Sequence, residues 1–395
     1  MHSAERLSRV QFSEIRLILT RAQEMERQGQ KVIHMEIGEP DFPTPAHIVE
    51  RAIWALEAGM THYASNRGTP SLLQAIGRKM AKDHGIHINP EKEVIVTVGA
   101  AEAILDSMLA FLNPGDEVII LNPCFFNYIH CAHIAGAKPV LVPLDSKNGF
   151  QVDPEALKGA VTPKTRMIAF NTPHNPTGAV LNLDSLKSIA EVAIANDLLV
   201  LSDEIYEKIL FDGAVHHSIA SLPGMKERTI TINGFSKAYA MTGWRLAFIA
   251  ADEQLIPSIL KIHQYNTTCV TTFAQEAAAL ALDGPTGPLE EMVAEFDRRR
   301  RVILQALQGM EGVACPVPQG AFYIFPDIRS FGMSSKEFCD MILDRAGVAI
   351  VPGSAFGPAG EGFVRLSYAT SLDLIQEGME RMRAALPKLG GARAV

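Results

Sequence analysis

Residues 198–203 read Leu-Leu-Val-Leu-Ser-Asp, an apolar run of strand length that ends in a carboxylate. A run without polar alternation is typical of a strand that is buried on both faces, as in a parallel sheet covered by helices. Ligands of an open α/β sheet bind in the crevice beyond the carboxyl ends of its strands. Asp203 stands at such an end, so we expect it either to face a ligand or to cap a following helix.

The rest of the chain favours the same α/β class. Helix-like and strand-like segments alternate without internal repeats, which predicts a mainly parallel central sheet flanked by helices. The 395 residues exceed one ordinary domain, and a hydrophobic content of 47% is sufficient for a sizeable core. Proline-containing connections at 39–45 and 283–288 predict a large domain over 46–285, and a smaller α+β domain built from 1–45 and 286–395.

Lys237 ends the segment Gly-Phe-Ser-Lys at 234–237, and Arg245 follows shortly after it. A lysine amine can hold an aldehyde as an imine, and a nearby serine hydroxyl and guanidinium can bind a phosphate. Together these groups are suited to pyridoxal phosphate, so the large domain is predicted to bind this cofactor. Most lysines are solvated surface charges, and this interpretation of Lys237 therefore depends on neighbouring motifs.

A rigid turn supplies one such motif. Residues 171–178 read Asn-Thr-Pro-His-Asn-Pro-Thr-Gly after a strand-like run, and the prolines and the glycine restrict the backbone. Asn175, with help from Tyr206, could then donate to a ring hydroxyl, although Asn171 and Asn175 could instead satisfy backbone groups of the turn. Asp203 would keep a pyridine nitrogen protonated, because an opposite charge favours the charged form.

In their order along the chain, these motifs resemble those of the class I and II aminotransferases, which are fold type I pyridoxal phosphate enzymes. The resemblance covers about 38–367, nearly the whole chain. It implies three catalytic residues. Lys237 would hold pyridoxal 5'-phosphate as a Schiff base, Asp203 would pair with the ring nitrogen, and Tyr206 would share the ring 3-hydroxyl oxygen with Asn175.

The same resemblance implies the rest of the cofactor site. Phe125 occupies the position whose aromatic ring stacks on the cofactor, where many relatives have Trp or Tyr. The phosphate would lie at the start of a helix, where small residues expose backbone N–H groups, with two side chains completing the cup. The residues assigned to the phosphate are Ala100, Ala101, Ser236 and Arg245. Tyr63 resembles a tyrosine that relatives supply from the neighbouring subunit, which implies a homodimer with shared active sites.

Two further residues are assigned to the substrate, together with Asn175. Arg365 matches the arginine that binds the substrate α-carboxylate, for which a planar two-donor fork is well suited. Without the family pattern, Arg365 would be read as an ordinary surface arginine beside a strand. Gly38 resembles the segment that closes over the substrate, and its alternative is a plain turn glycine.

The implied reaction moves an amino group from an L-amino acid to a 2-oxo acid such as 2-oxoglutarate or pyruvate. Some relatives that act on aspartate have a lysine where Ala101 stands, and others supply an arginine from a loop of the partner subunit. The loop expected here, 263–268, contains no arginine. A neutral, apolar or aromatic donor is therefore at least as well supported as aspartate.

Two other functions remain open. A C–S β-lyase acting on cysteine-like substrates would use the same cofactor, although Tyr206 and the complete Asn-Pro-Thr-Gly turn favour transfer. A pyridoxal-phosphate-sensing regulator would need a DNA-binding module, and no basic helix-turn-helix segment precedes the fold.

Composition restricts the partners. A net charge of −8 argues against nucleic acid and anionic membranes, and the one basic run, 298–301, follows acidic residues and predicts a salt-bridged, solvated helix face. No apolar run is long enough to cross a bilayer. Five cysteines without regular spacing predict reduced thiols in the cytoplasm. No metal site is expected, because the pairs His84/His87 and His216/His217 lack nearby ligands in the sequence and are read as surface histidines.

Overall fold

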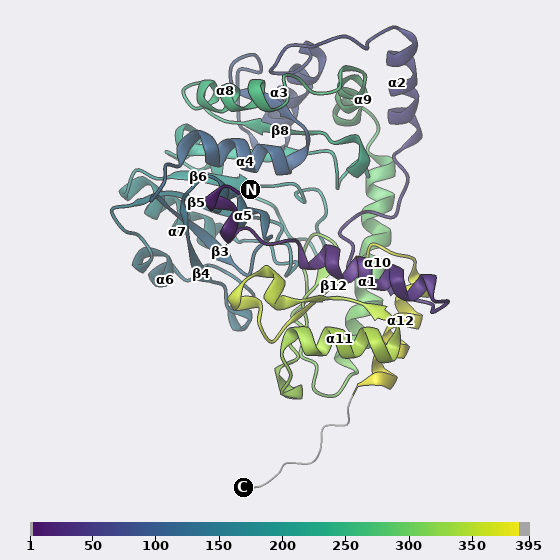
Figure 1. Ribbon diagram of the computed structural model, residues 1–395. Coiled ribbons are helices and arrows are strands. Elements are labelled where there is room, and N and C mark those ends of the chain that lie inside the picture. Colours follow the sequence, from purple (N-terminus) through teal and green to yellow (C-terminus); the bar gives the residue numbers. More distant parts are fainter. Residues whose placement is uncertain (1–2, 387–395) are drawn as a thin grey trace.

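A seven-stranded sheet forms the centre of the computed structural model, which describes residues 3–386 (Figure 1). Its strands follow the order β2-β8-β7-β6-β5-β3-β4, and every strand is parallel to the others except β8, which is antiparallel to both neighbours. The strands are β2 Val94–Thr97, β3 Glu117–Asn122, β4 Lys138–Pro143, β5 Thr165–Asn171, β6 Leu199–Asp203, β7 Thr229–Gly234 and β8 Ala247–Ala250. The predicted mainly parallel sheet is confirmed.

Helices cover both faces of this sheet, so its strands alternate between two apolar cores. In β5, Met167 and Ala169 belong to one core, while Ile168 and Phe170 belong to the other. This alternation is the period of two that a strand imposes on its side chains. The helices around the sheet are α2 Ala46–Glu57, α3 Pro70–His84, α4 Gly99–Phe111, α5 Asn127–Ile134, α6 Pro154–Gly159, α7 Leu183–Ala195, α8 Ile256–Asn266 and α9 Thr272–Asp283.

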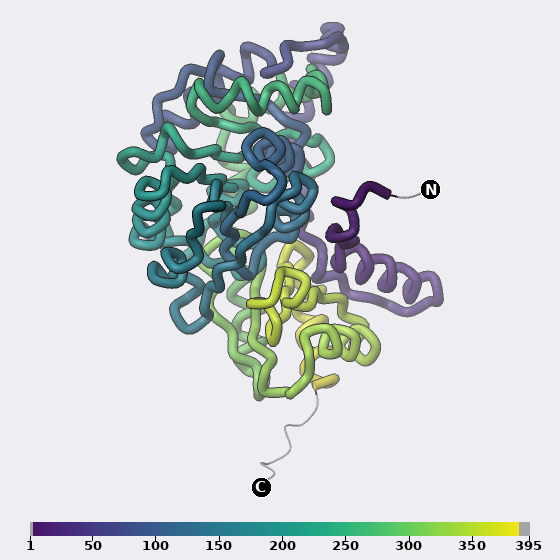
Figure 2. The backbone as a smooth tube through the Cα atoms, turned by 60° about the vertical axis from the view of Figure 1, so that its left-hand side comes forward, coloured from purple at the N-terminus to yellow at the C-terminus, as the bar shows by residue number. Residues whose placement is uncertain are grey.

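A smaller α+β region combines both ends of the chain, as predicted. The short strand β1 (Ile33–His34) pairs in parallel with β10 (Val348–Ala349), so the N-terminal segment lies beside the C-terminal part (Figure 2). An antiparallel sheet in the order β11-β12-β9 lies in the same region. The remaining elements are β9 Tyr323–Ile324, β11 Val351–Pro352, β12 Val364–Ser367, α1 Glu14–Arg27, α10 Gly287–Gln308, α11 Ser335–Ala346 and α12 Leu372–Ala385.

Short 3₁₀ helices connect the larger elements. They are η1 Glu5–Arg9, η2 Ser146–Asn148, η3 Ile219–Ser221, η4 Lys226–Arg228, η5 Thr242–Trp244, η6 Arg329–Phe331, η7 Gly353–Phe356 and η8 Pro358–Gly360. The predicted domain boundaries at 45/46 and 285/286 stay a prediction, and the last part of the predicted small domain, 387–395, lies outside the described residues.

Two local expectations need correction. The predicted loop at 263–268 is helical as far as Asn266, because α8 continues through a segment without glycine or proline. The basic run 298–301 lies on α10 and forms the predicted salt bridges, but Arg299 and Arg300 are buried rather than solvated. Arg299 Nη1 lies 2.7 Å from Asp41 Oδ1, which ties α10 to the connection that leads into the large domain.

The five cysteines, all within the described part of the chain, are free thiols, as predicted. Among residues 3–386, no helix combines the length and the apolar character that a membrane span requires.

Candidate active site

All of the site residues predicted from the sequence except Tyr63 line one cavity of about 420 Å³. It lies at the carboxyl edge of the sheet, where β5 ends at Asn171, β6 at Asp203 and β7 at Gly234. Parallel strands bring these ends together even though long crossovers separate them in sequence. Of the predicted site residues, the cavity is lined by Gly38, Ala100, Ala101, Phe125, Asn175, Asp203, Tyr206, Ser236, Lys237, Arg245 and Arg365.

Lys237 follows β7 and places its amine inside this cavity. Its Nζ donates to the carbonyl oxygen of Gly38 at 2.6 Å and lies 5.8 and 5.7 Å from the ring centroids of Tyr206 and Phe322. Burial lowers the pKa of Lys237 to about 8, against the opposing charge of Glu39. An amine with this pKa is partly uncharged near neutral pH, which suits both attack on a carbonyl and proton transfer.

Asp203 presents a buried carboxylate to the same cavity. Its Oδ2 accepts a hydrogen bond from the Tyr128 hydroxyl at 2.7 Å, and its Oδ1 accepts one from the backbone N–H of Ile205 at 3.1 Å. Burial raises the pKa of Asp203 to about 6, and these two hydrogen bonds oppose that rise. The carboxylate is therefore mostly charged at neutral pH, and such a charge is suited to a cationic ligand atom such as a protonated pyridine nitrogen.

The start of α4 forms a cradle for an anion. Its first residue is Gly99, and the preceding Val98 makes no side-chain cap hydrogen bond with the described residues. Gly99 has a φ of +75°, which disfavours other residues, and a Cβ there would also displace the guanidinium of Arg245, so this position favours glycine. Ser236, Ala100 and Ala101 line the same part of the cavity. Backbone donors at a helix N-terminus, a guanidinium and a hydroxyl together fit a phosphate group.

Arg365, on β12, is buried at the opposite side of the cavity, which corrects the alternative of a surface arginine. Its Nη1 donates to Asn175 Oδ1 at 3.1 Å, its Nη2 donates to the carbonyl oxygen of Glu36 at 2.5 Å, and its Nε has no partner among the described residues. The guanidinium lies over the ring of Tyr323, 4.5 Å from its centroid. A buried guanidinium without a carboxylate partner is suited to bind one.

The remaining predicted residues differ in how they meet the cavity. The Tyr206 hydroxyl lies 2.7 Å from the hydroxyl of Tyr323, so it faces the interior of the site. Phe125 packs edge-on against Tyr128, with ring centroids 6.2 Å apart. Tyr63 is 89% exposed and lines a separate depression, so it makes no contact with this cavity in the same subunit.

Several residues at the site were not predicted from the sequence, among them Tyr128, Tyr323 and Arg16. Tyr128 stands three positions after Phe125, and this helical spacing was the one signal that could have found it. Tyr323 and Arg16 carry no comparable signal, because β9 and α1 approach the cavity only through tertiary packing.

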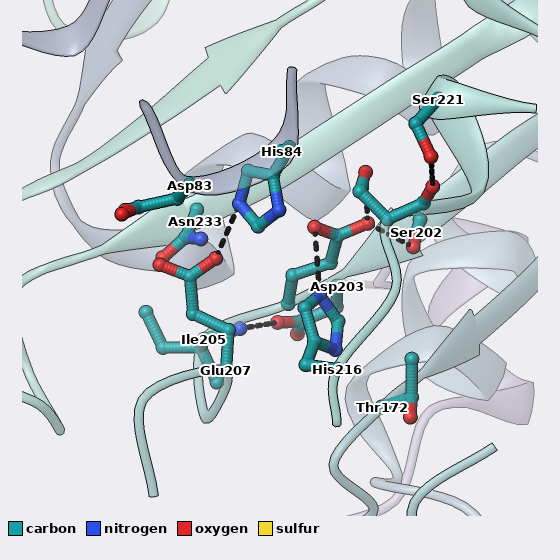
Figure 3. A network of polar contacts seen from close by, with 12 residues as sticks. Asp83, His84, Thr172, Ser202, Asp203, Ile205, Glu207, His216, Ser221 and Asn233 are labelled. Atoms are coloured by element: carbon teal, nitrogen blue, oxygen red, sulfur yellow. Dashed lines mark hydrogen bonds and ion pairs between the residues drawn. The ribbon is translucent and has the colours of Figure 1, made fainter. Parts of the chain in front are cut away.

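A buried polar network lies behind Asp203 and corrects the interpretation of two histidines (Figure 3). The side chain of His216 is 4% exposed and its Nε2 lies 3.1 Å from Glu204 Oε2; that of His84 is 5% exposed and its Nε2 lies 2.6 Å from Glu207 Oε2. Both were expected at the surface without nearby ligands, but folding brings 79–84 against 204–216. The side chains of His84, Glu204, Glu207 and His216 place possible metal-ligand atoms within 4.8 Å of one another. The Lys79 ammonium, 2.5 Å from Glu207 Oε1, already supplies a positive charge to this cluster.

The fold and this cavity define an enzyme that uses pyridoxal phosphate, since one set of side chains fits the aldehyde, the ring nitrogen and the phosphate of that cofactor. The chain belongs to the family described as aminotransferase class I and II, whose model matches residues 30–382. It is therefore an enzyme of the transaminase class, acting on amino acid and oxo acid substrates.

Curated relatives and solved structures cover almost the entire chain. An aspartate aminotransferase of Pyrococcus abyssi is 48% identical over 98% of both chains, and an aromatic-amino-acid aminotransferase of Thermococcus litoralis is 47% identical over the same shares. The crystal structure of the aspartate aminotransferase from Rhizobium meliloti has a TM-score of 0.94 at 38% identity and covers 98% of each chain. The relatives thus differ in the donor named while sharing the fold.

The lowered pKa of Lys237 predicts its reactivity in the cofactor-free protein. Because burial disfavours the ammonium form, labelling of Lys237 by acetic anhydride should reach half of its maximum near pH 8. Peptide mass spectrometry across about pH 6 to 11 measures this, and exposed Lys82 on α3 controls for general reactivity. Half-maximal labelling of Lys237 only near the ordinary lysine value of about 10.4 would contradict the predicted shift.

Proposed function

We propose that this enzyme transfers the amino group of an aromatic or acidic L-amino acid to a 2-oxo acid such as 2-oxoglutarate or pyruvate. The observation that carries the proposal is that Lys237 and Arg365, which come from the two regions of the fold, open into one cavity that also contains Asp203. An amine for the cofactor and a guanidinium for a substrate carboxylate thereby face the same space.

In this proposal, each part of the cofactor has residues that hold it. Lys237 would attach to its carbonyl carbon, Asp203 would pair with the ring nitrogen, and Phe125 would pack on the ring face. Asn175 and Tyr206 hold the ring hydroxyl oxygen. The phosphate is bound by Ser236, Arg245 and the N-terminus of α4 with Ala100 and Ala101. When bound, the cofactor supplies an electron sink for the pair released when the Cα–H bond of the substrate breaks.

The side chains of the protein perform the remaining steps. The Arg365 fork binds the α-carboxylate and fixes the amino acid with its α-hydrogen toward Lys237. The Lys237 Nζ would take that proton and later return it, and a pKa of about 8 is close to the value such a base requires. The segment at Gly38, whose carbonyl oxygen accepts from Lys237, closes the cavity and excludes water.

The cavity walls support donors of two kinds. Ile15, Leu19, Ile37 and Phe126 provide an apolar surface for an aromatic side chain. Arg16 lines the same edge, and its guanidinium forms no ion pair or hydrogen bond within residues 3–386. It can therefore bind the side-chain carboxylate of aspartate, glutamate or 2-oxoglutarate, a role for which neither Ala101 nor the segment 263–268 offers a lysine or arginine.

The assembly and location belong to the same proposal. We infer a homodimer in which Tyr63, exposed and remote from its own cavity, reaches the cofactor of the partner subunit. The enzyme acts in the cytoplasm, with a large domain over 46–285 that binds the cofactor and a small domain formed by 1–45 and 286–395.

The function is tested by following the cofactor absorbance between about 300 and 500 nm while single amino acids are added without an acceptor. An aromatic amino acid or aspartate should convert the spectrum in the native enzyme. Lys237→Ala should show no turnover, because both the attachment and the proton transfer are lost, whereas exposed Lys261→Ala should behave as the native enzyme. Pyruvate and thiol release from a cysteine conjugate in place of conversion would show elimination instead.

Arg16→Gln should separate the two kinds of donor. We expect kcat/KM to fall about 3- to 30-fold for aspartate, because a charge-assisted contact at a partly exposed site is lost, and to stay nearly constant for phenylalanine. Arg27→Gln, at the far end of the same helix and outside the cavity, is the matched control. Equal losses for both donors in Arg16→Gln would refute the assignment of Arg16 to the side-chain carboxylate.

Sharing of active sites predicts complementation between two defective variants. A mixture of Tyr63→Ala and Lys237→Ala subunits forms hybrids in which one of the two sites has both native residues. After refolding in equal amounts, activity should reach about a quarter of the native value, above the mean of the two parents. A mixture that only averages its parents would show that Tyr63 does not serve the partner's site.

A further inference from the structure

We propose that Tyr128 is a positioning residue, whose hydroxyl orients the Asp203 carboxylate toward the cofactor ring nitrogen and stabilises its charge. The inference rests on the proposed role of Asp203. No motif of the sequence pointed to Tyr128, which lines the cavity beside Asp203 and whose hydroxyl has no other hydrogen-bond partner within the described part of the chain.

The contact geometry fixes the plane of the carboxylate. Tyr128 donates to Oδ2 at 2.7 Å, and the backbone N–H of Ile205 donates to Oδ1 at 3.1 Å. One donor on each oxygen prevents rotation about the Cβ–Cγ bond, so the free lone pairs keep a constant direction. Burial and the charge of Asp203 raise the pKa of Tyr128 well above its ordinary value, so the tyrosine keeps its proton and always acts as the donor.

Tyr128 is itself held rigidly. Its side chain is 1% exposed and packs in the core formed by α4, α5 and the central sheet. Phe125, just before α5, meets its ring edge-on at 6.2 Å. The short segment 125–128 therefore positions two groups: the Phe125 ring, assigned to the cofactor face, and the Tyr128 hydroxyl, which contacts Asp203.

The electrostatic consequence has a definite sign. Burial raises the pKa of Asp203 to about 6, and the charge of Glu204 acts in the same direction, whereas the Tyr128 hydroxyl, the Ile205 N–H and the Lys237 charge oppose it. Without the hydroxyl, the pKa of Asp203 rises further. Binding of the ring nitrogen requires the charged carboxylate. As the pH falls, a variant without the hydroxyl therefore loses cofactor affinity at a higher pH than the native protein does.

The experiment measures the dissociation constant of pyridoxal phosphate by absorbance titration between about pH 5 and 8. It compares the native protein with Tyr128→Phe, Asp203→Asn, and the double variant. Tyr128→Phe removes only the oxygen. Tyr368→Phe is the matched control, a fully buried tyrosine outside the cavity whose hydroxyl donates to the carbonyl oxygen of Ala321 at 3.2 Å. Thermal unfolding of each cofactor-free variant reports its folding.

We expect Tyr128→Phe to weaken the cofactor about 10- to 100-fold at pH 7, since a hydrogen bond to a charged group is lost, and to shift the acid limb of the affinity profile upward. In the Asp203→Asn background the same substitution should change affinity less than about threefold, because the partner charge is absent. Tyr368→Phe should keep both the affinity and the pH profile of the native protein.

The outcomes separate the inference from the function on which it rests. Native affinity in Asp203→Asn would overturn the proposed role of Asp203 itself. A weakened Asp203→Asn with native affinity and pH profile in Tyr128→Phe would overturn the role of Tyr128 alone. An equal loss from Tyr128→Phe in both backgrounds would show that the tyrosine acts on the fold and not through Asp203.

Discussion

Charges withdrawn from water are costly unless they are paired, and three in this cavity, the partly buried Lys237 and the buried Asp203 and Arg365, form no ion pair within residues 3–386. At each of them, hydrogen bonds with neutral groups replace ion pairs. The amine of Lys237 donates to a backbone carbonyl, Asp203 accepts from a tyrosine and a backbone N–H, and Arg365 donates to an amide oxygen and a carbonyl. These neutral partners stabilise the three charged groups without neutralising them. The charges therefore remain available to pair with a ligand.

Such an arrangement requires a rigid frame, and the central sheet provides it. Parallel strands buried on both faces end at one edge, so Asp203 and Lys237 are positioned by β6 and β7, two neighbours in the sheet. Arg365 comes from a different sheet, and its distance from Lys237 depends on how the smaller region packs on the larger one. The ion pair between Arg299 and Asp41 and the pairing of β1 with β10 hold that smaller region together.

Local signals explain what the sequence could predict. Lys237, Asp203, Asn175 and Arg365 each follow or lie in a strand-like run or rigid turn, and the order of these motifs along the chain, which resembles that of the family, indicated a role for each. The roles of His84 and His216 depend only on contacts with segments far away in the chain. The spacing of a motif cannot reveal such contacts, which is why His216 was placed at the surface while it lies buried against Glu204.

The turn after β6 both presents side chains to the cavity and anchors the backbone that carries them. Asp203 and Tyr206 line the cavity, whereas Glu204 and Glu207 point into the polar network on the other side, where serine hydroxyls, histidines and Lys79 bind them. The spacing of three residues within each pair places its members on the same side of the turn. Glu204 and Glu207 therefore anchor the backbone that carries Asp203 and Tyr206, and a carboxylate held from behind in this way can remain charged, oriented and open to a ligand at the front.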